Sequence, residues 1–194
     1  MEFIVILAII TLFTLWHELG HIAVARLRGL TIEKFGFSWR PYPHPYVAVS
    51  DVPSQRDGLL FLGAGSAFTL LLTIVLSLTG IWRFEVVYWA ICIQWLIETN
   101  PFYSDLTLAA NSLLPEQRLR AYLAEHQPDH VDQYGMDGLL AYYRSTIDAT
   151  VGRYLNLYAF SAPWYLHFVL WIGLFALLFG PHSPLATGVL ISLF

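Results

Sequence analysis

Charged residues are scarce in this chain. Asp, Glu, Lys and Arg make up 12% of its 194 residues, whereas soluble domains carry about 25%. Hydrophobic residues account for 57%, which leaves too little polar surface to cover a water-soluble fold. The net charge is -4 without a basic cluster, which argues against a nucleic-acid partner. The composition therefore predicts an integral membrane protein in contact with a lipid bilayer.

Cysteine is almost absent, since Cys92 is the only one. A single thiol excludes an internal disulfide and any metal site built on a CxxC pair. Cys92 lies in an apolar stretch, so we expect it to be a small buried side chain.

Four apolar segments approach the length needed to cross a bilayer, which is about 20 residues. They are residues 3–25, 59–78, 85–103 and 157–179. A last apolar stretch, residues 185–194, is too short to span and is expected to be a half-helix or an interfacial tail. We predict an all-α membrane protein with about four transmembrane helices.

Residues 30–58, between the first two spans, have a different pattern. Alternating and aromatic residues at 32–39 are followed by three prolines and by Tyr46-Val47-Ala48-Val49. This pattern predicts a small β-hairpin with a Pro-rich connection at the cytosolic membrane surface. An exposed strand edge there would hold a peptide in extended form through main-chain hydrogen bonds. The alternative is a hairpin that only caps the membrane face.

Residues 107–156 form the most polar stretch, with short amphipathic helices expected at 116–125 and 137–154. We divide the chain into residues 1–110, a core of three spans plus the hairpin, and residues 111–194. The second part holds the cytosolic amphipathic helices, the fourth span and the short apolar tail.

The basic residues indicate an orientation. With four spans, nine of the ten Lys and Arg residues fall on one side of the membrane. Positive residues favour the cytoplasmic side. Both long loops are therefore expected in the cytosol and both termini outside, in a prokaryotic cell membrane.

The first span contains the sequence His17-Glu18-Leu19-Gly20-His21. On a helix, residues four apart share one face, so both imidazoles can bind one metal ion. Glu18 is rotated by about 100° from His17 and lies beside such an ion, where it can take a proton from a bound water. Three ionisable residues within one membrane helix cost several kcal/mol, which favours this interpretation over a polar patch without metal.

A catalytic zinc ion takes three protein ligands and keeps one open position. The candidates for the third ligand are Asp105 and Glu98. Asp105 matches the expected depth of the histidines and follows Pro101, which interrupts the helix. Irregular backbone at that depth is tolerated only around a buried or water-filled site, so Asp105 is favoured. Glu98 would otherwise pair with Gln94 or support a zinc-bound histidine.

The remaining histidines are weaker candidates. His126 and His130 are also four apart, but Pro128 interrupts a shared helix. We expect surface histidines there, a loop histidine at His44, and a core or interfacial histidine at His167.

Several of these segments together resemble the site-2 protease family of intramembrane zinc metalloproteases. His17–His21 lies in the first span, and Gly63-Ala64-Gly65-Ser66-Ala67 near the start of the second is similar to a small-residue motif of that family. Asn100-Pro101-Phe102-Tyr103-Ser104-Asp105 is similar to its Asn-Pro…Asp segment. The resemblance covers roughly residues 1–110.

The resemblance implies that His17, His21 and Asp105 bind Zn²⁺, that Glu18 is the catalytic base, and that Asn100 holds the substrate or the developing oxyanion. It also implies an endopeptidase whose partner is a membrane-embedded or membrane-adjacent protein or peptide. The alternative is a non-catalytic zinc-binding membrane protein that acts as a chaperone or transporter partner. A homo-oligomer is compatible with either.

Overall fold

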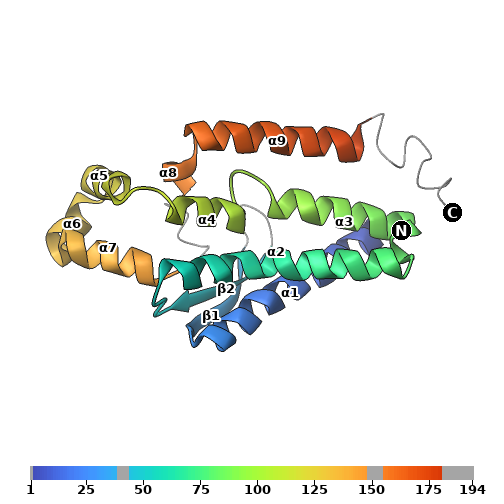
Figure 1. The fold of residues 1–194 in the computed structure, drawn as a ribbon, viewed down its shortest axis with the longest axis horizontal. Helices are drawn as coiled ribbons and strands as arrows, with labels where there is room; N and C mark the ends of the chain where they lie inside the picture. The colour runs from blue at the N-terminus through green and yellow to red at the C-terminus, as the bar shows by residue number, and fades with distance from the viewer. Residues whose placement is uncertain (1, 39–43, 148–154, 181–194) are drawn as a thin grey trace.

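The computed structural model describes residues 2–38, 44–147 and 155–180. It is mostly helical. Three of its helices are long and apolar enough to cross a membrane, over Ile4–Arg28, Gln55–Leu78 and Ala162–Phe179. They correspond to α1 (Glu2–Arg28), α2 (Gln55–Leu78) and α9 (Ala162–Phe179). In Figure 1, α2 and α9 follow the long axis of the molecule, and α1 crosses beside α2.

The third predicted span is shorter than expected. After the short helix η1 (Ile81–Arg83), α3 (Glu85–Glu98) has 14 residues, which is about 21 Å at 1.5 Å per residue. The hydrocarbon core of a bilayer is about 30 Å thick. α3 ends where Asn100 and Pro101 redirect the chain, and α4 (Asp105–Ser112) follows after a turn. Three helices in the described part of the chain therefore qualify as spans, instead of the four predicted.

The last span also begins later than the sequence indicated. Within residues 157–179, the chain first completes the short helix α8 (Leu155–Tyr158) and then turns. Ser161 caps α9 by accepting a hydrogen bond from the backbone N–H of Trp164, and Pro163 fits the first turn of the helix. The predicted tail at 185–194 lies outside the described residues.

The predicted hairpin is confirmed. β1 (Thr31–Ser38) and β2 (His44–Ser50) pair in antiparallel fashion, with an irregularity between Ile32 and Lys34. The Pro-rich connection at 39–43 lies outside the described residues. Val49 of β2 also pairs with Ile147, through two backbone hydrogen bonds of 2.9 Å. The hairpin closes a core at the junction of α1 and α2, formed by Ala25, Leu30, Val47, Val49, Val52, Phe61 and Leu62.

The polar stretch folds into a small helical unit. It comprises α5 (Glu116–His126), α6 (Pro128–Tyr134) and α7 (Met136–Ser145), around a core of Leu123, Leu139 and Leu140. The predicted helix at 137–154 is shorter than expected, since α7 ends at Ser145, Thr146 is extended and Ile147 pairs with Val49. Residues 148–154 lie outside the described part.

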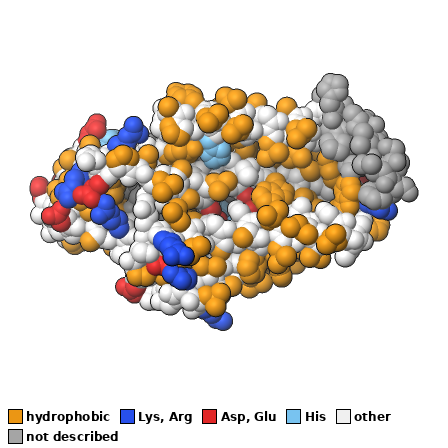
Figure 2. Space-filling view, viewed as in Figure 1, with side chains coloured by type: hydrophobic (Ala, Val, Ile, Leu, Met, Phe, Trp, Pro, Cys, Tyr) orange, Lys and Arg blue, Asp and Glu red, His pale blue; other side chains and the backbone are white. Residues whose placement is uncertain are grey.

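The surface is divided along the long axis. Figure 2 shows hydrophobic side chains over the helices in the middle of the molecule and charged side chains around α5–α7 and the hairpin. Large apolar residues of α9 such as Leu166, Val169 and Leu170 are more than 60% exposed. An apolar belt of this kind, together with three helices of spanning length, indicates a membrane protein.

Candidate metal centre

The centre begins with the two histidines of α1. His17 and His21 lie one helical turn apart, as the spacing predicts. Both are buried, at 7% and 4% exposure. Their rings meet edge to face, with centroids 4.8 Å apart. Both imidazoles are therefore directed to one point on the inner face of the helix.

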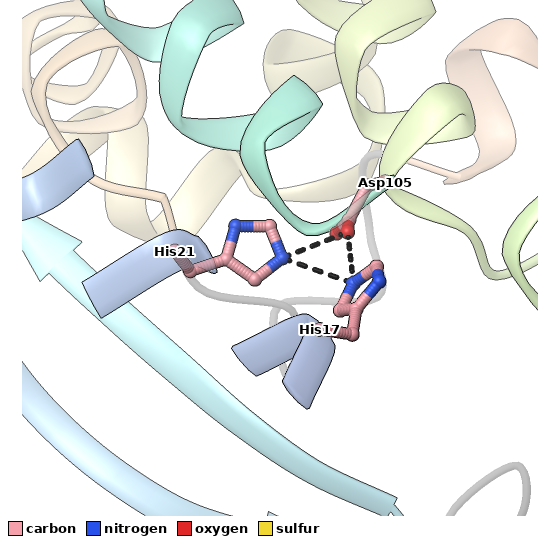
Figure 3. A group of neighbouring side chains, drawn as sticks. All are labelled: His17, His21 and Asp105. Carbon is pink, nitrogen blue, oxygen red and sulfur yellow. Dashed lines mark hydrogen bonds and ion pairs between the residues drawn. The ribbon is translucent and has the colours of Figure 1, made fainter. Parts of the chain in front are cut away.

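Asp105 completes the group from a different part of the chain (Figure 3). Its Oδ2 lies 2.9 Å from Nε2 of His17 and 2.9 Å from Nε2 of His21, and the two Nε2 atoms are 3.1 Å apart. Ligand atoms of one tetrahedral zinc ion, at bonds of about 2.0–2.1 Å, lie about 3.3 Å apart. The spacing thus fits three ligands of a single ion, and the three residues predicted as ligands are brought together.

The outer nitrogens of the imidazoles determine what faces this point. Nδ1 of His21 lies 2.8 Å from the carbonyl oxygen of Phe61, and Nδ1 of His17 lies 3.0 Å from Oε1 of Glu98. A carbonyl and a carboxylate both accept hydrogen bonds, so in neutral imidazoles the proton belongs on each Nδ1. Both Nε2 atoms then present lone pairs toward Asp105. Three acceptors around one point repel each other unless a proton or a metal cation lies between them.

This donor set suits zinc. Two imidazoles and one carboxylate leave an open position in a tetrahedral site, as catalytic zinc ions require. The same donors also bind other first-row divalent metals. The group can therefore hold a metal ion, and its composition alone does not identify which metal is bound.

Glu98, the alternative third ligand, lies on the far side of His17 from Asp105. Its Oε1 contacts Nδ1 of His17, and it also receives hydrogen bonds from Gln94 and Thr69. Nδ1 and Nε2 of one imidazole point in divergent directions, so Glu98 does not share an ion with Nε2. Among the described residues the metal-binding group is His17, His21 and Asp105.

The break after α3 positions Asp105. The hydroxyl of Ser104 accepts a hydrogen bond from the backbone N–H of Thr107 and donates one to the carbonyl of Asn100. Ser104 is thus the N-cap of α4, and Asp105 occupies its first turn, where a negative charge is favourable. Pro101 and Ser104 together explain why a carboxylate appears at the depth of the histidines.

Asn100 does not join the group. Its Oδ1 accepts hydrogen bonds from the backbone N–H groups of Phe102 and Tyr103, and its Nδ2 donates to the carbonyl of Ile97 at 2.5 Å. These contacts form the turn between α3 and α4. The predicted role of Asn100 toward a substrate stays a prediction, and the structure gives its side chain a turn-forming role.

Glu18 lies beside the group and not within it. It is 7% exposed and interacts electrostatically with both histidines, with Asp105 and with the backbone of Val47 in β2. The candidate base is therefore held between the metal-binding group and the hairpin. Figure 2 shows acidic atoms in a recess between α9 and α2, and the side chain of Asp105 is 19% exposed. The metal-binding group is therefore accessible from the surface of the protein.

The histidines require a close approach of α1 and α2. A Cβ on Gly20 would lie 2.6 Å from the carbonyl oxygen of Ala64, and a Cβ on Gly65 would overlap the His17 ring. The small residues around Gly65 allow such an approach. Thr69, which the sequence analysis did not single out, is 3% exposed and supports Glu98 and His17. A hydroxyl in the apolar part of α2 was the available signal.

The other described histidines lie outside this centre, but His44, expected in a loop, is the first residue of strand β2. His126 stacks on Tyr122, and His130 stacks on Tyr134. His167 of α9 contacts the carbonyl oxygen of Thr99 at 2.8 Å. Cys92 is buried, as expected.

Comparison with protein-family models, curated proteins and solved structures finds no match to this chain. The resemblance to site-2 proteases therefore depends on its sequence motifs alone.

Proposed function

We propose that this chain is an intramembrane zinc endopeptidase of the site-2 protease type. The observation that supports this most directly is the arrangement of His17, His21 and Asp105 around one point, with the carboxyl of Glu18 beside it. The carbonyl oxygen of Phe61 and the carboxylate of Glu98 accept the Nδ1 protons, so that the lone pairs of both Nε2 atoms point toward Asp105. A metal held only for structural stability would not require an additional buried carboxylate next to its open side.

A zinc ion bound by these three residues would polarise a water molecule and lower its pKa toward about 7. In such a site Glu18 would accept a proton from the water that attacks the peptide carbonyl carbon, and would pass it to the leaving nitrogen as the C–N bond breaks. One water molecule is consumed, and a carboxyl and an amine are formed.

We assign substrate binding to the outer edge of β2. Peptide hydrolysis requires an accessible carbonyl, which a helical substrate hides in its own hydrogen bonds. Ile147 already pairs with this edge at Val49, so the edge accepts an antiparallel extended segment. Val47, two residues closer to the hairpin connection, contacts Glu18. A substrate strand beside Val47 would bring its carbonyls close to the base.

We infer that α3 with the following turn is the fourth membrane-embedded element, buried between α1 and α9. Seven of the described Lys and Arg residues lie toward the hairpin and α5–α7: Arg26, Arg28, Lys34, Arg56, Arg118, Arg120 and Arg144. Arg83, between α2 and α3, lies at the other end of these helices. By the positive-inside rule, this charge distribution supports the proposal that the hairpin and the α5–α7 unit face the cytosol and the termini lie outside.

The deciding experiment compares wild type with Glu18→Gln. The zinc content of purified protein is measured beside cleavage of a co-expressed, tagged single-span membrane protein. Glu85→Gln makes the same chemical change at an exposed position of α3 and serves as the control. We expect zinc in all three proteins, and cleavage by wild type and Glu85→Gln only.

Two other results would contradict the proposal. The absence of zinc from purified wild-type protein would show that the proposed centre does not bind zinc. If Glu18→Gln retained zinc and full biological activity, the chain would be a zinc-binding membrane module, such as a chaperone or transporter partner, and not a hydrolase.

A further inference from the structure

Glu98 is a buried carboxylate that the proposed hydrolysis does not use. It lies on the last turn of α3 and is 5% exposed. A charged side chain at membrane depth is costly unless partners compensate for its lost hydration. Its Oε2 has no hydrogen-bond partner among the described residues. A buried carboxylate with one oxygen left without a partner requires an explanation other than the stability of the helix.

The other oxygen of Glu98 is surrounded by donors. Oε1 lies 3.0 Å from Nδ1 of His17, accepts a hydrogen bond of 2.8 Å from Gln94, and accepts a short one from the hydroxyl of Thr69. Gln94 in turn accepts a hydrogen bond from Thr14, at 3.2 Å. Residues from α1, α2 and α3 thus hold one carboxylate oxygen against one imidazole nitrogen.

The two histidines therefore differ in what supports them. His21 is backed by a neutral carbonyl, that of Phe61, whereas His17 is backed by a carboxylate. A carboxylate fixes the imidazole proton on Nδ1 and makes Nε2 a stronger ligand than a carbonyl does. Glu98 and Asp105 also supply two negative charges, which balance a divalent cation at a depth where solvent contributes little.

We propose that Glu98 is the positioning residue of the metal centre, acting through His17 to fix its tautomer and to balance the charge of the ion. This inference assumes the metal site of the proposed function but not its proteolytic activity. It assigns Gln94 and Thr69 the role of holding Glu98 in place. It also explains why Oε2 is left without a partner, because the cation compensates the carboxylate through the imidazole.

The test is the affinity for Zn²⁺ of Glu98→Gln, measured in detergent by competition with a chromophoric chelator. Gln has nearly the shape of Glu but lacks its charge. Loss of such an outer partner typically lowers metal affinity about 10–100-fold, and we expect a loss in this range. Glu85→Gln, the same change on the exposed start of α3, should bind Zn²⁺ like wild type.

The metal-free proteins provide a readout that separates positioning from folding. Gln keeps an acceptor oxygen for the donors around Oε1 and removes a buried charge, so the thermal midpoint of metal-free Glu98→Gln should equal or exceed that of wild type. A merely structural Glu98 predicts the opposite, a lower midpoint with unchanged affinity. Co²⁺ loading adds a spectroscopic check, because the visible absorption of Glu98→Gln should shift as His17 becomes a weaker ligand.

A second variant covers the case in which Glu98→Gln does not fold. Thr69→Val removes one donor to Glu98 and keeps the charge, so a loss of Zn²⁺ affinity of a few fold is expected. Zn²⁺ affinity within twofold of wild type in the variants that fold would overturn the proposal. If wild type binds Zn²⁺ but cleaves no substrate, the proposed function fails while the role of Glu98 can still be decided.

Discussion

Gly65 of α2 lies directly against the imidazole of His17, so that a Cβ at this position would overlap the edge of the ring that carries Nε2. The absence of a side chain at one position of α2 therefore allows a metal-binding residue of α1 to take its place. A backbone carbonyl limits the approach of the same two helices at Gly20. The two glycines are required by packing and not by backbone conformation.

Gly65→Ala should weaken metal binding. The added methyl group must displace either His17 or α2, and overpacking of this kind costs about 1–3 kcal/mol. If this cost falls on the metal site, Zn²⁺ affinity drops by about tenfold or more, since about 1.4 kcal/mol corresponds to a factor of ten. Chelator competition measures the change.

Gly63→Ala is the matched control for this substitution. It lies one residue before Ala64 on the same helix, and no heavy atom of the described chain lies within 4 Å of a Cβ built there. Its Zn²⁺ affinity should equal that of wild type. Equal losses in both variants would show that α2 tolerates no added methyl group, and would contradict a specific contact with His17.

The sequence predicted most of this centre because its signals are local. The spacing of His17 and His21 depends only on helical geometry, and Asp105 was favoured by its depth and by Pro101. The length of α3 was overestimated because the apolar composition continues through Phe102 and Tyr103, past the point where the Asn100 turn ends the helix. The contact between Glu98 and His17 was only one of several alternatives, because it depends on how α1 and α3 pack.

The outer edge of β2 shows at which position a proline would test the proposed binding of an extended substrate. The N–H of Val49 pairs with Ile147 and therefore points away from β1, and Val47, two residues earlier on the same strand, directs its N–H to the same side. Tyr46 and Ala48, which alternate with them, direct their N–H groups toward β1. Among positions 46–49, proline at Val47 is therefore the change that disturbs the outer edge while it spares the hairpin ladder and the Ile147 pair.

Val47→Pro should lower substrate cleavage by about two- to tenfold without loss of zinc, since it removes one main-chain donor from the edge that would bind the substrate, and such a hydrogen bond contributes about 0.5–1.5 kcal/mol. Val47→Ala removes the same buried side chain but keeps the N–H, and it is the control. Cleavage rates and zinc content are measured for both. Cleavage that falls equally in both variants would assign the effect to packing and not to the strand edge.

The break after α3 is stabilised by side chains of α9. Trp164, His167 and Trp171 contact the carbonyl oxygens of Pro101, Thr99 and Leu96, at 2.9, 2.8 and 3.0 Å. Their spacing of three and four residues places them on one face of α9. This face supplies hydrogen bonds to carbonyls near the point where the helix ends, which irregular backbone at membrane depth requires.

Trp164→Phe should destabilise the protein by about 1–3 kcal/mol, because it leaves the buried carbonyl of Pro101 without its donor. It should also weaken Zn²⁺ binding, since the same turn leads to Asp105. Thermal unfolding in detergent and chelator competition measure the two effects. The control is Trp89→Phe, because the indole of Trp89 donates to the exposed side chain of Glu85. A stable variant with normal Zn²⁺ affinity would show that α9 does not support the turn.

The α5–α7 unit is expected to lose stability in acid through Glu116. Hydrogen bonds from Arg120 and Arg144, at 2.7 and 2.5 Å, hold the pKa of Glu116 below its ordinary value of 4.5. Because the folded pKa is the lower one, the stabilisation is fully present above about pH 4.5 and is lost as the pH falls through the folded pKa.

Hydrogen exchange of α5–α7 amides, corrected for intrinsic rates, should show this loss in wild type. Glu116→Gln should show weaker protection near pH 7 and a smaller change in acid. Glu125→Gln alters a side chain of α5 that is 78% exposed and should behave like wild type, whereas an acid response unchanged in Glu116→Gln would assign it to another carboxylate.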